Sequence, residues 1–248
     1  RVIQMAKPPI QFKITKKLAT IILNTMVNLE VEGKKNIPEE ETFILISNHL
    51  NWSDPFYIYS IFPAEPRIMF VAEYEGIYDS KFNKKFIDFM GKPIITIDRT
   101  RTHSRSAGLK SMFKVVRSGE ILAIFPEGRI GHEEGELFPF HVGVFSLAKK
   151  LGIPILPLGI AGSKELYFRK PVKINIGKLH YAKEDETNED FARRMALTVK
   201  DLIPEYPGEG PFPGFGNWMT NLCQGELRPF EGENDLIIPT NKEKNNNS

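Results

Sequence analysis

The chain of 248 residues contains a single cysteine, Cys223. One cysteine cannot form an intrachain disulfide, so nothing in the sequence points to an oxidising compartment. The sequence also lacks a cluster of histidines and cysteines with the spacing of a metal site. A glycine-rich phosphate loop is absent as well. We therefore expect neither a bound metal nor a nucleotide cofactor.

The sequence has no apolar run of the ~20 residues that a membrane-spanning helix needs. The most apolar stretch near the start, residues 18–29, is interrupted by polar residues, and no signal peptide is visible. Its apolar residues recur at helical spacing after three lysines. This pattern suits a helix in a membrane interface and, equally, a helix packed on the protein core. We expect a peripheral or monotopic protein on the cytoplasmic face of a membrane.

The whole chain has little excess of either charge, because 33 Lys and Arg residues nearly balance 31 Asp and Glu residues and the net charge is only +2. Residues 80–118 are the exception, with ten Lys and Arg residues against two acids, a local net charge of +8. Such a concentration predicts an anionic partner, which could be a phosphate head group, coenzyme A, an acyl carrier protein or an anionic membrane surface. We expect no nucleic acid partner, because no zinc spacing, recognition-helix pattern or aromatic RNA-binding motif accompanies the charge.

A histidine and an aspartate, His49 and Asp54, lie five positions apart in the segment Asn-His-Leu-Asn-Trp-Ser-Asp. An apolar run at 43–46 precedes them and predicts a short buried strand. Pro55 follows them and suits the first turn of a helix. The pair is therefore expected at the carboxyl end of a strand, where open α/β sheets usually form their sites. An imidazole beside a carboxylate can act as a general base with an orienting partner.

Three further segments are informative. Two of them carry candidate site residues, and the third predicts another short strand. Residues 125–129, Phe-Pro-Glu-Gly-Arg, follow an apolar run and offer a carboxylate, a flexible glycine and a guanidinium that can grip a phosphate. Residues 91–99 end in Ile-Asp-Arg, and Arg101 follows closely. Residues 152–160 form an apolar strand bracketed by Pro154 and Pro157, which indicates an edge strand or a bend rather than a regular central strand.

The four segments, in this order, resemble those of the glycerophospholipid acyltransferases, among which the lysophosphatidic acid acyltransferases are best known. The resemblance runs from about residue 29 to about residue 178. It implies that His49 is the general base of an HX4D motif and Asp54 its partner. It also implies an acceptor site, for which we expect contacts from Asn48, Arg99, Arg101, Glu127, Gly128 and Arg129. The chain departs from the family where Thr or Ser often follows Glu-Gly, because Arg129 stands there.

The resemblance implies transfer of a fatty acyl group from a thioester, acyl-CoA or acyl carrier protein, to a hydroxyl of a lysophospholipid, foremost 1-acyl-glycerol-3-phosphate. Since the sequence has no Gly-x-Ser-x-Gly elbow, we expect direct transfer without a covalent enzyme intermediate. Two alternatives stay open: another lipid or glycan hydroxyl as acceptor, and a catalytically silent lipid-binding membrane module. A hydrolase, in which water replaces the acceptor, is a weaker third.

Strand and helix patterns alternate, which predicts an α/β fold with a largely parallel central sheet flanked by helices. We expect an amphipathic helix in residues 1–30, one acyltransferase domain in 31–203, and a Pro/Gly/aromatic-rich extension with a polar tail in 204–248. The expected strands lie near 29–33, 43–47, 67–72, 93–98, 121–125, 154–160 and 171–177. The expected helices lie near 12–28, 55–62, 80–90, 109–116, 142–151 and 189–202.

Overall fold

A computed structural model describes residues 10–39, 41–73, 93–97, 102–165, 167–206, 208 and 218. Its strands are β1 (Val27–Glu32), β2 (Ile44–Ser47), β3 (Ile68–Glu73), β4 (Ile94–Ile97), β5 (Ile121–Ile124), β6 (Ile155–Ala161) and β7 (Lys170–Ile176). They form one sheet in the order β1-β7-β6-β2-β5-β3-β4. Only the β6–β7 pair is antiparallel among these neighbours, so the expected largely parallel sheet is confirmed.

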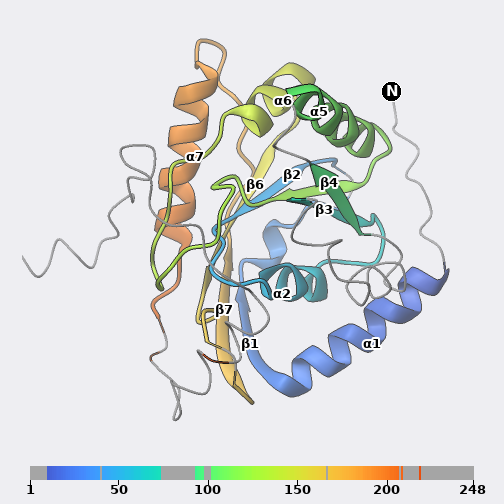
Figure 1. The fold of residues 1–248 in the computed structure, drawn as a ribbon, viewed down its shortest axis with the longest axis vertical. Helices are drawn as coiled ribbons and strands as arrows, with labels where there is room; N and C mark the ends of the chain where they lie inside the picture. Colours follow the sequence, from blue (N-terminus) through green and yellow to red (C-terminus); the bar gives the residue numbers. More distant parts are fainter. Residues whose placement is uncertain are drawn as a thin grey trace, which may run out of the picture.

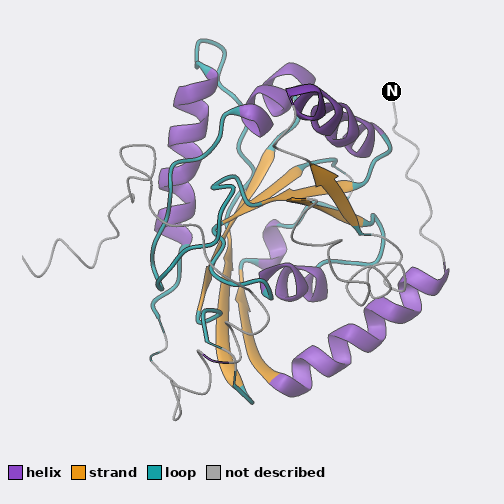
Figure 2. Ribbon diagram, in the orientation of Figure 1, coloured by secondary structure: helices purple, strands orange, loops and turns teal. Residues whose placement is uncertain are grey.

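Helices cover both faces of this sheet (Figure 1). One face carries α1 (Ile10–Met26) and α2 (Asp54–Ile61), and the other carries α5 (Thr102–Arg117), α6 (Gly143–Leu151) and α7 (Asn188–Leu202). The central strands are apolar on both faces, as parallel strands between two helical layers must be. Alternate residues of β2, for example, enter the two separate hydrophobic clusters. The sheet with its two helical layers is clear when the ribbon is coloured by element type (Figure 2).

Local sequence signals set several helix ends. The side-chain oxygen of Thr187 accepts a hydrogen bond from the Asp190 N–H (3.0 Å) and caps the start of α7. Gly152 ends α6 in the left-handed conformation, with φ of 65°, that favours glycine. The helices expected near 142–151 and 189–202 are therefore confirmed. The helix expected near 80–90 lies outside the described residues, as do Cys223 and most of the segment 204–248.

Strand β6 differs from its expected place at an edge or a bend. It lies in the middle of the sheet, between β7 and β2, and all seven of its residues are buried. Ile155 directs its N–H to the His180 carbonyl (2.8 Å), so Pro157, two residues on, directs its missing N–H to the same side. Strand β7 has already ended there at Ile176. Beside the proline the chain makes a single bond, from the Gly177 N–H to the Pro157 carbonyl (2.9 Å), so this end of the pair uses only the proline's acceptor, and the pairing with β2 is intact.

Helix α1 runs into β1 without a loop, and a short 3-10 helix, η1 (Lys34–Asn36), follows β1. The helix and strand expected here are confirmed within two residues of their ends. Within the described part of the chain, no helix combines the length and the apolar character that crossing a membrane requires.

Candidate active site

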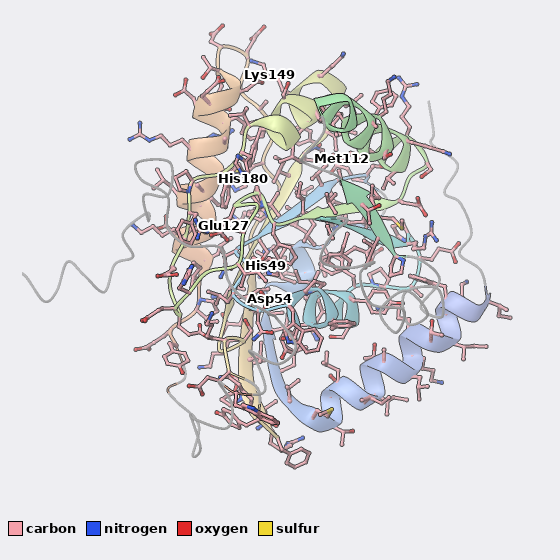
Figure 3. The ribbon with its side chains drawn as sticks, viewed as in Figure 1. His49, Asp54, Met112, Glu127, Lys149 and His180 are labelled. Atoms are coloured by element: carbon pink, nitrogen blue, oxygen red, sulfur yellow. The ribbon has the colours of Figure 1, made fainter. Side chains whose placement is uncertain are left out.

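The predicted histidine and aspartate meet at the carboxyl end of β2 (Figure 3). Strand β2 ends at Ser47 and α2 begins at Asp54, so the intervening turn lies where β2 and its parallel neighbours β5 and β6 all end. The His49 Nδ1 atom lies 2.9 Å from Asp54 Oδ2. The strand–turn–helix arrangement therefore brings the two side chains together as the spacing predicts.

Asp54 is fully buried and fixed by three donors on one oxygen. Its Oδ2 accepts hydrogen bonds from the backbone N–H groups of Leu50 (2.7 Å) and Asn51 (2.9 Å) and lies against His49 Nδ1. Two backbone donors on this oxygen identify it as an acceptor, so Nδ1 of His49 must carry the hydrogen that it donates. That tautomer leaves Nε2 of His49 with a free lone pair for a proton from a substrate.

The imidazole of His49 is held in its plane by Phe125, the residue that follows β5. The two rings stack with centroids 4.0 Å apart and an angle of 13° between their planes. The His49 side chain keeps 16% of its surface exposed, whereas that of Asp54 has none. The imidazole is thus partly accessible, and Asp54 is sheltered from water.

Glu127 supports the backbone of the histidine turn. Its Oε1 accepts the N–H of His49 (2.8 Å), its Oε2 accepts the N–H of Phe138 (2.8 Å), and the side chain is buried. Burial raises the pKa of Glu127 to about 8, although both backbone hydrogen bonds lower it in part by favouring the ionised form. The sequence predicts that this carboxylate shapes the acceptor pocket. The structure instead commits both oxygens to backbone groups.

The raised pKa of Glu127 predicts a pH-dependent stability. The ordinary pKa of a glutamate is 4.5, so between pH 4.5 and about pH 8 the folded protein holds a proton on Glu127 that the unfolded chain has released. The free energy of unfolding therefore falls as pH rises through this window, by at most about 1.4 kcal/mol per pH unit from this group. Glu127→Gln removes the titration, while the half-buried Glu134 remains in both proteins as a common background. We expect urea denaturation at several pH values to show the wild-type advantage over the variant shrinking from pH 4.5 to 8. A constant difference would contradict the assignment.

Asn48 joins the end of β2 to β6 rather than facing a substrate. Its Nδ2 donates to the Ile160 carbonyl (2.9 Å), and its Oδ1 accepts the Ile160 N–H (2.8 Å). The side chain is fully buried. Asn51 makes a second link to the same side by donating from Nδ2 to the Lys164 carbonyl (2.9 Å). Both asparagines therefore fix the histidine turn, which differs from the substrate contact predicted for Asn48.

The Glu-Gly-Arg segment forms a turn that holds the other side of His49. Gly128 has φ of 66°, a left-handed conformation that favours glycine, and its N–H donates to the Phe125 carbonyl (3.1 Å). Gly131, three residues on, donates its N–H to the His49 carbonyl (2.8 Å). Together with Glu127, this loop fixes both backbone groups of the histidine.

Arg129 lies in the same loop, buried against an aromatic ring. Its guanidinium carbon is 4.4 Å from the Phe138 ring centroid, and Nη2 is 3.3 Å from Nε2 of His132. The plane of the guanidinium is therefore fixed by Phe138 and His132. Its expected role as an anion ligand stays a prediction, and Arg99 and Arg101 lie outside the described residues.

Two residues beside the histidine turn were not predicted from the sequence, Glu134 in the loop after Arg129 and Lys164 just after β6. Glu134 accepts the backbone N–H groups of Lys164 (2.9 Å) and Gly162 (3.1 Å), and Lys164 Nζ donates to the Gly131 carbonyl (2.8 Å). Burial raises the pKa of Glu134 and lowers that of Lys164. The sequence signal was the acid-rich and glycine-rich segment 131–136, in which the half-buried Glu134 and Glu136 accept from backbone N–H groups.

This geometry defines an α/β protein with a histidine–aspartate pair on a strand–turn–helix. A family model described as Acyltransferase matches residues 28–161, more than half of the chain. The chain belongs to this acyltransferase family.

Curated relatives and a solved structure agree with that family. The chain is 27% identical over 199 residues to the chloroplastic 1-acyl-sn-glycerol-3-phosphate acyltransferase BAT2 of Brassica napus, covering 77% of this chain and 56% of that protein. It is 27% identical over 176 residues to the 1-acyl-sn-glycerol-3-phosphate acyltransferase of Bacillus subtilis, covering 69% and 83%. The crystal structure of the 1-acyl-sn-glycerophosphate acyltransferase PlsC from Thermotoga maritima superposes with a TM-score of 0.62 at 20% identity, over 79% of this chain and 81% of that one. The last likeness establishes the fold.

Proposed function

We propose that the protein transfers a fatty acyl group from an acyl thioester to the free hydroxyl of 1-acyl-glycerol-3-phosphate, which yields phosphatidic acid. The observation that carries the proposal is the His49–Asp54 pair, with its 2.9 Å contact and its available Nε2. The names of the curated relatives support this acceptor. The donor is acyl-CoA or an acyl-loaded carrier protein.

The reaction needs one base and no covalent enzyme intermediate. His49 Nε2 takes the proton of the acceptor hydroxyl as its oxygen attacks the thioester carbonyl carbon. Asp54 stabilises the imidazolium that forms. When the tetrahedral intermediate collapses, the carbon–sulfur bond breaks and the imidazolium returns its proton to the leaving thiolate. Atoms balance without water, and a thioester is already an activated acyl donor.

Arginine side chains are proposed to hold the acceptor phosphate. Arg129, whose guanidinium is fixed over Phe138, stands in the loop that contacts His49. Because guanidinium can bind phosphate oxygens in a bidentate manner, this position would set the distance between the phosphate and the reacting hydroxyl. Arg99 and Arg101 are proposed as further ligands from the sequence pattern alone.

The direct test is an acceptor panel with one labelled acyl thioester. Lysophosphatidic acid should gain the label, while a lysophospholipid with a zwitterionic head group should gain much less. Label on another lipid or glycan alone would overturn the acceptor and leave the base mechanism in place. Thiol release that is independent of any acceptor would favour the hydrolase.

Membrane docking through α1 is part of the proposal. Six large apolar residues lie along one side of this helix with 50–77% of their surface exposed: Ile10, Ile14, Leu18, Ile21, Ile22 and Met26. The opposite side packs on α2, where Phe12 is buried against Tyr59 and the Lys16 Nζ donates to the Tyr59 carbonyl. The helix thus packs on the core with one face and offers the other to a bilayer.

A triple substitution tests this face of α1. Ile14→Ser, Leu18→Ser and Ile22→Ser together should weaken binding to phospholipid vesicles by roughly 10²-fold or more, since each removes apolar surface from the bilayer interface. Because the three side chains are exposed, thermal stability should change little. Vesicle sedimentation measures the binding, and Leu197→Ser on the exposed side of α7 is the matched control. Equal binding of both variants would exclude docking through α1.

A further inference from the structure

The described part of the β6–β7 connection lies against the end of α1. The N–H of Arg169 donates to the carbonyl of Met26 (2.5 Å), and Lys170 is the register partner of Val27. Phe168, just before this link, is 68% exposed. Phe168 therefore stands next to the end of α1, where the row of exposed apolar residues on that helix also ends at Met26.

Arg169 has an unusual backbone conformation. Its φ of 61° makes it the one non-glycine residue at positive φ among those the structure describes. This conformation is unfavourable for a residue with a Cβ atom, and glycine would adopt it freely. Strain of this kind in a turn suggests that the side chain itself is needed there.

A cavity of about 570 Å³ opens beside the same turn, between β1, the end of α1 and the end of α2. Arg169 lines the end of the cavity beside the turn, together with Asn24 and Asn28. Lys34 lines its far end, because β1 separates Val27, which lies beside Arg169, from Lys34. The acid that also lines it, Glu30, lies 3.8 Å from the ammonium of Lys173. The near end of the cavity is therefore polar and cationic, which suits a phosphate group.

The turn is at the edge of the sheet that carries the active site. Strand β7 runs antiparallel to β6, so its first residues lie beside the carboxyl end of β6, and Ala161 pairs with Lys173. The carboxyl end of β2, where His49 lies, is at this same edge (Figure 1). A membrane contact at the turn would hold that edge toward the bilayer from which a lipid acceptor comes.

We propose that the Phe168–Arg169 turn is a second membrane contact and that the adjoining cavity binds the phosphate head group of an anionic bilayer phospholipid. Phe168 enters the membrane interface beside α1, and Arg169, at the near end of the cavity, binds the phosphate. This site is separate from the His49 centre. The inference rests on the membrane docking of the proposed function and needs no particular acyl acceptor.

Fluorescence tests the aromatic contact. Tryptophan at a membrane interface emits at shorter wavelength than in water, so Phe168→Trp should show a blue shift when phosphatidylcholine–phosphatidylglycerol vesicles are added. Leu197→Trp on α7 is the matched control and should not shift. The wild-type protein, with its own two tryptophans, provides the background. Binding to vesicles without a shift for Phe168→Trp would overturn the contact, whatever acceptor the enzyme uses.

Two substitutions test the head-group site by vesicle sedimentation. Arg169→Gly keeps the left-handed turn and removes the cation, so binding to equimolar phosphatidylcholine–phosphatidylglycerol vesicles should weaken about fivefold, with binding to pure phosphatidylcholine unchanged. Lys34→Ala removes a cation at the far end of the cavity and should lose clearly less. Equal losses for Arg169→Gly and Lys34→Ala would reject the site. Acyl transfer to a water-soluble short-chain acceptor should be unchanged in these variants, which separates this site from the catalytic one.

Discussion

A His49→Ala variant is expected to transfer the acyl group about 10²–10⁴-fold more slowly than the wild-type protein, the usual contribution of a positioned general base. The expectation follows from the proposed role of Nε2 as the base, since Nδ1 has Asp54 as its partner and the side chain keeps 16% of its surface exposed. The loss should appear in kcat with a labelled thioester and lysophosphatidic acid, because the proton is taken in the reacting complex.

The same variant should remain folded and bind lipid. Glu127 and Gly131 hold the backbone groups of His49, and the substitution does not remove those groups. His180→Ala is a matched control, since it removes an imidazole whose backbone pairs with Ile155, at the end of β6 opposite to the carboxyl end beside His49. A catalytically silent lipid-binding module would show no thioester turnover in either the wild-type protein or the variants. If His49→Ala turned over the thioester as fast as the wild-type protein, His49 could not be the base.

The strand–turn–helix that carries His49 could be predicted from local sequence. An apolar run, a polar turn and a proline in the first helical turn each specify one element, and their order specifies the site's place at the strand end. Strand β6 shows the limit of this reasoning. Pro157 argues against a central strand when it is considered alone, yet β7 ends beside it and the chain uses only its carbonyl there, which accepts the Gly177 N–H. Only the register of two distant strands reveals that.

The role of Glu127 could not be predicted for a similar reason. Its motif identifies a carboxylate at a strand end, but its two partners, His49 and Phe138, come from different loops. A short sequence motif does not distinguish a carboxylate that contacts substrate from one that accepts buried backbone N–H groups. The structural link made by Asn48 could not be predicted either, because its partner Ile160 is more than a hundred residues away; its substrate contact stays a prediction.

Asp54→Ala is expected to cost nearly as much activity as His49→Ala. It removes the acceptor for Nδ1–H of His49 and leaves the N–H groups of Leu50 and Asn51 without their carboxylate. Each buried donor that loses its partner costs about 1–3 kcal/mol. The variant should therefore unfold at a lower urea concentration as well as lose turnover, and stability must be measured beside kcat.

Asp54→Asn separates the charge of this residue from its geometry. If the asparagine turned its NH₂ group toward the imidazole, the histidine would be held in the wrong tautomer. The equivalent change in serine proteases lowers kcat by about 10⁴. Here two backbone N–H groups require an oxygen at the Oδ2 position, so the asparagine carbonyl should stay there and continue to accept from Nδ1–H. Only the charge that stabilises the imidazolium is lost, and a charged hydrogen bond contributes roughly 1.5–3 kcal/mol, or roughly 10- to 100-fold in rate. A loss near 10⁴ in kcat for this variant would show that the amide has turned and that these backbone donors do not fix the tautomer.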